Sequence, residues 1–325
     1  MAPKEKINIL LVSFGGPTPG CCKRVDPCPG EAYCFVSGIF GHNPARKERI
    51  DEVVEHYTTV GGFSRFNEIT EAQGEAVRKE LSKRGVDATI YSGYHHWKPY
   101  VSDVIAGMAN EGVGEFLVLV MSPHQSSVSW DGYVRLVAES INKLGSRAPQ
   151  VLGVVEPFWN ATGFIDAIAD NVRAAAKKAG WSLSSKDTAV LFSAHSVPES
   201  VSKTSPYCSQ IVETSRLVLQ KLGSPNAMGA YQSQPEDSRI PWTGPFLKDG
   251  IKQLASDGIK NIIGIPVGFL GDNVEVLYDL GIEGEYAAKE HGARFVRAEA
   301  VNTHPAFITM LADRVQEKLA QVAKV

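Results

Sequence analysis

The sequence lacks long hydrophobic runs and an excess of either charge. Its apolar runs are short and strand-like, such as residues 116–121, and a membrane-spanning helix needs roughly 18 apolar residues in a row. Lysine and arginine number 33 against 36 aspartate and glutamate, which gives a formal net charge of -3. A nearly neutral chain has no general electrostatic attraction for nucleic acid or for an anionic membrane. We therefore expect no nucleic-acid partner and no integral membrane segment.

Three common motifs are also missing. No G-x-G-x-x-G segment follows the first expected strand, and neither a P-loop nor a G-x-S-x-G nucleophile elbow is present. These motifs bind dinucleotides, bind nucleotide phosphates and present a nucleophilic serine, respectively. Their absence disfavours a Rossmann dehydrogenase, a P-loop enzyme and an α/β-hydrolase.

The N-terminus imitates an export signal without a cleavage site. Lys4 and Lys6 precede the apolar run at residues 7–14, but Gly15, Gly16 and Pro17 follow it. That turn chemistry is typical of a buried strand that gives way to a loop, and no A-x-A-like site follows. We therefore expect a soluble protein in the cytoplasm.

The 325 residues are about twice the length of a usual single core. Short β-branched runs alternate with segments of helical period, a pattern typical of βαβ units and a parallel sheet. The first half holds expected strands at residues 7–13, 88–93, 115–122 and 151–155, and the second half at 188–193, 227–232, 261–267 and 294–298. Helices are expected at residues 67–84, 100–110, 161–179 and 208–222, and a final packing helix at 306–325.

This pattern predicts an α/β fold of two similar Rossmann-like lobes, each with a four-stranded parallel sheet flanked by helices. We place the first lobe at residues 1–158, including a cysteine-containing loop at 18–34, and the second at 159–325. Ligands of such sheets bind beyond the carboxyl ends of the strands and between lobes. Chemistry is therefore expected at those strand ends.

His195 follows the expected strand at residues 188–193. A neutral imidazole at the mouth of a cleft can accept a proton or bind a borderline divalent metal. The alternative is a histidine that only forms a structural hydrogen bond. A second segment favours the functional interpretation: Glu275, Asp279 and Glu283 are four residues apart, so on a helix they form one row of oxygen ligands or proton acceptors. The alternative for that row is a solvated acidic face.

Several segments resemble the signature segments of ferrochelatases. They are residues 192–198 (Phe-Ser-Ala-His-Ser-Val-Pro), residues 266–279 (with Pro-Val-Gly-Phe and Glu-Val-Leu-Tyr-Asp), residues 232–245 (with Gln-Ser, Trp242 and Gly-Pro) and residues 61–73 (with Gly-Gly, Ser64, Asn67 and Gln73). The similarity extends over most of the chain in order and spacing.

The resemblance implies an enzyme, a lyase of haem biosynthesis that inserts Fe2+, its metal substrate, into a porphyrin between two lobes. It implies that His195 and Glu275 form the catalytic and metal-handling pair, and that Asp279 and Glu283 relay metal or protons. Contacts to the porphyrin are expected from Phe14, His56, Tyr57, Ser64, Tyr133 and Trp242. An iron donor or a downstream enzyme of the haem pathway are further partners to consider.

Three of the chain's departures from the family pattern bear on its chemistry. Asn273 stands where many relatives have a histidine, and an amide cannot accept a proton at neutral pH. Phe14 replaces a tyrosine that in some relatives ligates product iron, and His56 replaces an arginine near a propionate. The chain lacks the hydrophobic lip and the C-terminal membrane extension of some protoporphyrin enzymes, so the soluble coproporphyrin III type is favoured over the protoporphyrin IX type.

The remaining histidines have weaker signals. His95 and His96 follow an expected strand, and because side chains alternate along an extended backbone, at most one of them is expected to face a common site. For His124 we expect a hydrogen bond to the neighbouring turn.

Five cysteines are present, four of them close together at Cys21, Cys22, Cys28 and Cys34, with Cys208 apart. The spacing matches no standard zinc or ferredoxin pattern. Some ferrochelatases carry a 2Fe-2S cluster, but at other cysteine positions. Free thiols in a loop, an iron-sulfur cluster, and zinc or a disulfide therefore stay open as alternatives.

Two other functions compete with iron insertion. One is a cobalt or nickel chelatase, which acts on a corrin-type ring and has the same two-lobe architecture. The other is a tetrapyrrole-binding or iron-binding protein without turnover, which the residues at positions 273 and 14 make plausible.

Overall fold

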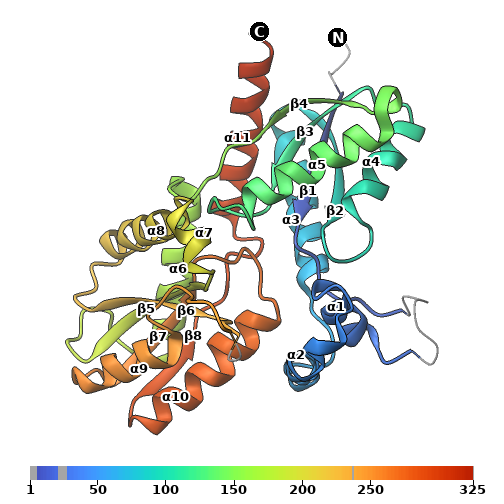
Figure 1. Cartoon of the computed structure of the whole chain (residues 1–325). Helices are drawn as coiled ribbons and strands as arrows, with labels where there is room; N and C mark the ends of the chain where they lie inside the picture. The colour runs from blue at the N-terminus through green and yellow to red at the C-terminus, as the bar shows by residue number, and fades with distance from the viewer. Residues whose placement is uncertain (1–5, 21–27, 236–237, 325) are drawn as a thin grey trace.

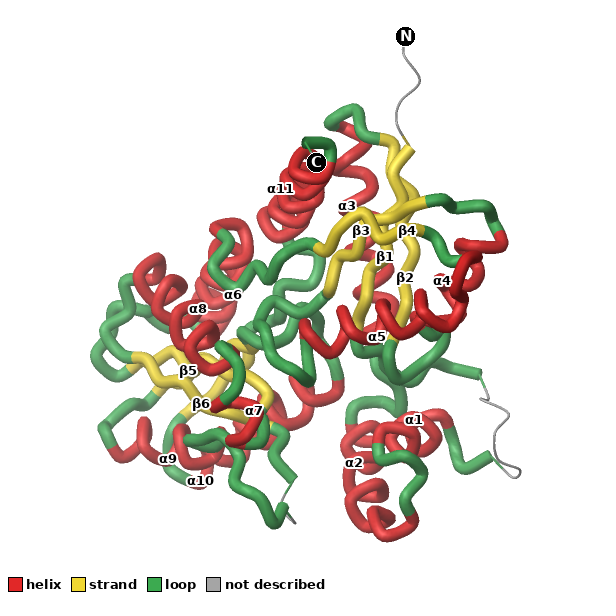
Figure 2. Tube along the Cα trace, turned by 45° about the horizontal axis from the view of Figure 1, so that its top comes forward, coloured by secondary structure: helices red, strands yellow, loops and turns green. Residues whose placement is uncertain are grey.

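Each half of the chain forms a four-stranded parallel sheet, and the strand order is the same in both. The computed structural model describes residues 6–20, 28–235 and 238–324. The first sheet has the order β2-β1-β3-β4, and its strands are β1 (Lys6–Ser13), β2 (Asp87–Tyr94), β3 (Glu115–Val120) and β4 (Gln150–Val154). The second has the order β6-β5-β7-β8, and its strands are β5 (Thr188–His195), β6 (Ala227–Gln232), β7 (Asn261–Pro266) and β8 (Arg294–Arg297). The two sheets lie in separate parts of the molecule (Figure 2), which confirms the predicted two-lobe α/β fold.

Helices flank both sheets. Those of the first half are α1 (Glu31–Ile39), α2 (Lys47–Thr59), α3 (Phe66–Lys83), α4 (Val101–Asn110) and α5 (Trp130–Leu144). Those of the second half are α6 (Thr162–Ala179), α7 (Glu199–Lys203), α8 (Tyr207–Leu222), α9 (Leu247–Ser256), the π-helix η3 (Val276–Glu283), α10 (Gly284–Glu290) and α11 (Pro305–Val322). Among the described residues, none of these helices combines the length and the apolar composition that crossing a bilayer demands.

The first sheet is buried on both faces, as its continuous apolar strands require. Ile9 and Leu11 of β1 pack in the cluster that contains Val77 of α3. The alternate residues Leu10 and Val12 pack in a second cluster with α4 and α5. Successive side chains of a strand point to opposite faces, so this one strand separates the outer helices from the interior of the molecule.

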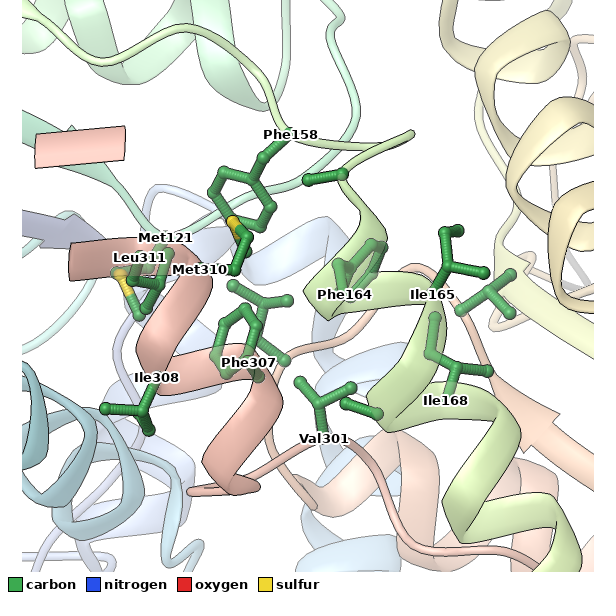
Figure 3. Packing of buried hydrophobic residues seen from close by; sticks show 14 of the residues in the cluster. Met121, Phe158, Phe164, Ile165, Ile168, Val301, Phe307, Ile308, Met310 and Leu311 are labelled. Carbon is green, nitrogen blue, oxygen red and sulfur yellow. The ribbon is translucent and has the colours of Figure 1, made fainter. Parts of the chain in front are cut away.

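The two lobes share one hydrophobic core. The cluster beneath β1 and β3 continues into residues of β5 and β7 of the second sheet. Phe158, Phe164 and Phe307 occupy its centre, where α6 and α11 cross (Figure 3). Helix α11 also contacts α3 and β4 of the first half. The C-terminal helix therefore packs against both lobes, and the exact lobe boundary near residue 158 stays a prediction.

Helices α1 and α2 form a small unit away from both sheets (Figure 1). Their own cluster contains Phe35, Tyr57 and Trp97, and it includes Val274 from the segment that precedes η3. The ring of Phe35 lies edge-on to those of Tyr57 and Trp97, with centroids 6.1 and 5.8 Å apart. This unit thus connects the first lobe to the start of the acidic segment of the second.

Most ends of the predicted strands and helices lie within two residues of the observed ends. Two differences matter for the site. Strand β5 extends to His195, so this histidine is the last residue of the strand and does not follow it. The acidic segment is a π-helix and not the regular helix that we expected. Hydrophobic periodicity does not distinguish the two, because residues four apart lie near one face in both and a π-helix differs only in its i to i+5 hydrogen bonds.

Candidate functional site

His195 and Glu275 meet where β5 and the start of η3 come together. The His195 Nε2 lies 3.6 Å from the Glu275 Oε2, and the two side chains are 37% and 30% exposed. The other ring nitrogen of His195 contacts the carbonyl oxygen of Ser196. A carbonyl only accepts, so Nδ1 donates this hydrogen bond, and Nε2 is the ring nitrogen that faces Glu275. In a neutral imidazole with this tautomer, Nε2 can accept a proton or bind a cation.

The backbone around His195 is held by its neighbours. The Tyr207 hydroxyl donates to the carbonyl oxygen of His195 at 3.0 Å. The Ser196 hydroxyl donates to the carbonyl oxygen of Thr243 at 2.8 Å. Both partners are buried, and burial raises the pKa of Tyr207, so its phenol stays protonated. The imidazole thus extends from a fixed main chain.

A polar network below the pair involves two residues that the sequence did not single out as site residues. The Gln232 side chain donates to the carbonyl oxygen of Glu275 at 2.8 Å and accepts from the Ser193 hydroxyl at 2.6 Å. The Ser233 hydroxyl lies 3.4 Å from the Glu275 Oε2 and also contacts the Asp279 Oδ2. Gln232 is the last residue of β6 and Ser233 follows it, so the rule that sites form at strand ends could have found both.

Asp279 is the buried member of the acidic row, with 6% of its surface exposed. Burial raises the pKa of its carboxyl from 3.8 to about 8, and the nearby charge of Glu275 adds to the effect. The Asp279 carboxyl therefore keeps its proton near neutral pH, and its Oδ2 accepts a hydrogen bond from the Ser233 hydroxyl. Glu283, at the end of η3, instead forms an ion pair with Lys248 at 3.1 Å.

The predicted row is thus present, although its three members differ in environment. A pocket of about 260 Å³ opens beside Asp279 and Glu283. Its walls come from α2, the end of β6, the start of α9 and η3, and they include Arg49, Glu52, His56, Ser233 and Lys248. Arg49 and Glu52 form an ion pair of 2.6 Å on one wall. Asp279 and Glu283 thus line an inter-lobe pocket and do not form a freely solvated helix face.

Asn273 has a structural role at the start of η3. Its side-chain oxygen accepts a hydrogen bond from the backbone N–H of Val276 at 2.9 Å, and its carbonyl oxygen accepts from that of Leu277 at 2.9 Å. A side chain that caps the first turn stabilises a helix. The amide that departs from the family pattern therefore anchors the acidic segment.

The expected porphyrin contacts fall into two groups. Tyr57, Ser64 and Tyr133 are buried, with 3%, 6% and 6% of their surfaces exposed. Phe14 is exposed, and Trp242 is half-buried with its indole N–H donating to Ser238 at 2.7 Å. His56 stacks on Tyr278 and faces Asp279. Phe14 and Trp242 therefore offer accessible aromatic surface, whereas the buried residues shape the walls behind it.

The structure corrects the expectation for His95 and His96. Their ring centroids are only 3.9 Å apart, and the His96 ring lies 4.5 Å from that of Phe14. The alternation rule fails here because the chain bends directly after β2 ends at Tyr94. Burial lowers the pKa of both histidines, that of His96 to about 4, so both rings are neutral near pH 7.

His124 connects the lobes and does more than bond a neighbouring turn. Its Nε2 lies 2.9 Å from the Thr214 hydroxyl of α8, and its Nδ1 is buried with no hydrogen-bond partner among the described residues. Nearby, the backbone N–H of Gln125 donates to the Gln210 side chain at 2.7 Å. Burial lowers the pKa of His124 to about 3.

Cys34 and Cys208 lie in different hydrophobic clusters. Cys34 lies in the α1–α2 core, whereas Cys208 packs beside the shared core and accepts a hydrogen bond from Ser202 at 3.2 Å. Cys28 is exposed, and Cys21 and Cys22 lie outside the described residues. Within residues 6–20, 28–235 and 238–324, no group of three or more histidine, cysteine, aspartate or glutamate side chains is arranged to hold a metal ion.

The fold is that of the two-lobed chelatases. The structure is similar over 98% of its length to the cobalt-bound sirohydrochlorin chelatase SirB of Bacillus subtilis, with a TM-score of 0.55, 10% identity and 97% of that chain covered. It is likewise similar to CbiX, described as the terminal enzyme of siroheme biosynthesis in denitrifying bacteria, with a TM-score of 0.53, 15% identity and coverage of 95% and 98% of the two chains. At this identity the likeness concerns the fold alone.

Sequence comparison gives the family. The family model described as Ferrochelatase matches residues 34–319. A ferrochelatase of Deinococcus radiodurans is 30% identical over 98% of both chains. A coproporphyrin III ferrochelatase of Oceanobacillus iheyensis is 32% identical over 97% of both. The chain belongs to the ferrochelatase family, and it is accordingly a metal chelatase, a lyase whose metal substrate is Fe2+.

Proposed function

We propose that this protein inserts Fe2+ into coproporphyrin III in preference to protoporphyrin IX. The observation that carries the site is the pairing of His195 with Glu275, in which the Nε2 lies 3.6 Å from the Glu275 Oε2. The relative named a coproporphyrin III ferrochelatase supports the choice of porphyrin, since it matches this chain over nearly its whole length. A second relative with that name, from Halalkalibacterium halodurans, is 32% identical over 98% of this chain.

In this proposal, His195 accepts protons from the pyrrole nitrogens. Metal insertion replaces two N–H protons of the porphyrin, so a base with an accessible lone pair is needed beside the ring. The protonated imidazole would lie against the Glu275 carboxylate, which stabilises its charge. The Ser233 hydroxyl contacts both Glu275 and Asp279, so a proton path can continue from the pair towards the pocket.

The same row offers oxygen ligands to the metal substrate. Glu275, Asp279 and Glu283 lie along or beside the inter-lobe pocket, and carboxylates suit a hard or borderline cation. Asp279 would release its proton on binding the cation. We assign the porphyrin to the cleft between the predicted lobes, residues 1–158 and 159–325. Phe14 and Trp242 would contact the ring, with Tyr57, Ser64, Tyr133 and His56 behind or beside it.

The test compares the two porphyrins directly. Purified protein is mixed anaerobically with Fe2+ and either coproporphyrin III or protoporphyrin IX, and insertion is followed by absorbance. We expect kcat/KM to favour coproporphyrin III at least tenfold. Equal values, or a preference for protoporphyrin IX, would reverse the assignment of substrate. Tight porphyrin binding with no insertion would support a binding protein without turnover.

We place the protein in the cytoplasm, with an iron donor or a downstream enzyme of haem synthesis as its partners. A 2Fe-2S cluster is a separate hypothesis that depends on Cys21 and Cys22 together with Cys28, Cys34 or Cys208. Protein purified anaerobically from iron-replete cells tests it. A brown preparation whose sulfide content falls on Cys28→Ser supports the cluster, and a colourless one contradicts it.

A further inference from the structure

His56 makes two contacts with the acidic segment of the opposite lobe. Its ring stacks on that of Tyr278, with centroids 3.8 Å apart and planes inclined by 14° (helix α2 lies beside the second lobe in Figure 1). Its Nδ1 also lies 3.8 Å from the Asp279 Oδ1. His56 belongs to α2, whereas Tyr278 and Asp279 belong to η3. Tyr278 and Asp279 follow His56 by 222 and 223 residues. The contact therefore forms only when the two lobes come together.

The sequence of α2 explains why His56 points this way. Tyr57 enters the α1–α2 core beside Phe35. Consecutive helix residues diverge by about 100° around the axis, so burial of Tyr57 directs its neighbour to the next face. Arg49 and Glu52 lie on the same face of α2 as His56, because Glu52 is three residues after Arg49 and four before His56. All three residues line the inter-lobe pocket.

The second lobe supplies a matching surface. Val274 packs into the same cluster as Tyr57, and Tyr278 follows it by four residues. Helix α2 therefore contacts the acidic segment at two successive turns, first through an apolar side chain and then through a stacked ring. Nearly parallel aromatic rings in contact are favourable beyond the area that they bury.

We propose that the stack of His56 on Tyr278 is an inter-lobe contact that positions α2 as one wall of the pocket over Asp279, and that it thereby governs binding of the metal substrate to the acidic row. This proposal rests on the proposed function of that row. It assigns His56 as a positioning residue, which differs from the porphyrin contact expected for this position. A fixed wall limits the water around the carboxylates, and their attraction for a cation is stronger where the local dielectric constant is low.

The first test measures the contact without any substrate. Hydrogen exchange of the α2 amides is compared in wild type, His56→Ala and His56→Phe. Loss of the stack in His56→Ala should speed exchange in α2 by roughly two- to tenfold, the range for one aromatic pair. The phenyl ring of His56→Phe should restore slow exchange. Tyr286→Ala, which removes an exposed ring on α10, is the matched control and should leave α2 unchanged.

The second test measures metal binding without porphyrin. Calorimetric titration with Zn2+ should give a Kd that is roughly two- to tenfold weaker in His56→Ala, with recovery in His56→Phe. Unchanged exchange in α2 and unchanged Zn2+ affinity, or a His56→Phe variant as impaired as His56→Ala, would overturn the proposal. Neither hydrogen exchange nor Zn2+ affinity depends on turnover. Absence of iron insertion in the wild type would therefore refute the proposed function without deciding whether the stack of His56 on Tyr278 fixes α2.

Discussion

Replacement of Asp279 by asparagine should change how stability depends on pH. The folded protein raises the pKa of this carboxyl from 3.8 to about 8, chiefly by burial. Between these values the folded state holds a proton that the unfolded state has released, so the stabilising contribution is full below about pH 4 and is lost as pH rises to about 8. At 1.36 kcal/mol per pKa unit, the total loss is on the order of 5 kcal/mol.

Asparagine has nearly the same shape and no charge, so Asp279→Asn should escape this loss. The free energy of unfolding is measured by urea denaturation at several pH values from 4 to 9, for wild type and variant, with two spectroscopic probes to confirm two-state behaviour. The variant-minus-wild-type difference should rise by up to about 1.4 kcal/mol per pH unit between pH 4 and 8 and then level off. A difference that is independent of pH would show that Asp279 ionises normally, and the argument from burial would be wrong.

Two further predictions concern the packing of α6 against α11 and the burial of His124. An added Cβ at Gly163 of α6 would lie 2.4 Å from the Ala306 carbonyl oxygen of α11 and 2.7 Å from the Met310 Cβ. Gly163→Ala should therefore lower the free energy of unfolding, measured by urea denaturation, by about 1–3 kcal/mol. The control is Gly107→Ala on α4, where an added Cβ meets nothing within 4 Å, and it should raise the free energy of unfolding by up to about 1 kcal/mol. Equal effects of the two substitutions would contradict the close crossing of α6 and α11. Burial lowers the pKa of His124 to about 3, so between pH 6.5 and 3 the unfolded state binds a proton at this residue and the folded state does not. The free energy of unfolding should therefore fall as pH drops from about 6.5 towards 3. His124→Gln should lack that part of the decline in acid denaturation, and an unchanged pH dependence would show that the histidine is not buried as described.

Much of the fold could be predicted from the sequence because local patterns carry it. Runs such as residues 189–192 and 262–267 are continuously apolar, as a sheet covered on both faces requires. The observed strands β5 and β7 begin at the expected residues 188 and 261. The shared core was not predicted. Residues such as Phe164 and Phe307 are apolar on helices that have no local signal for which lobe they face.

The sequence could suggest the chemical groups of the candidate site but not the contacts between them. His195 and Glu275 were identified from strand ends and spacing, and the structure brings them within 3.6 Å. The network of Gln232 and Ser233 was missed because neutral polar residues are common at strand ends. The stack of His56 on Tyr278 could not be foreseen, since it joins residues far apart in sequence through the docking of two lobes.

The central claim is that His195 and Glu275 act as one unit in metal insertion. A double-mutant cycle tests it most directly: rates of anaerobic Fe2+ insertion into coproporphyrin III are measured for wild type, His195→Ala, Glu275→Gln and the double variant, with the exposed neighbours His291→Ala and Glu290→Gln as controls. Each single variant should lose at least about 100-fold in kcat, and the double variant should be no slower than the slower single variant. Single variants that retain activity within tenfold of the wild type, or losses that multiply in the double variant, would contradict it.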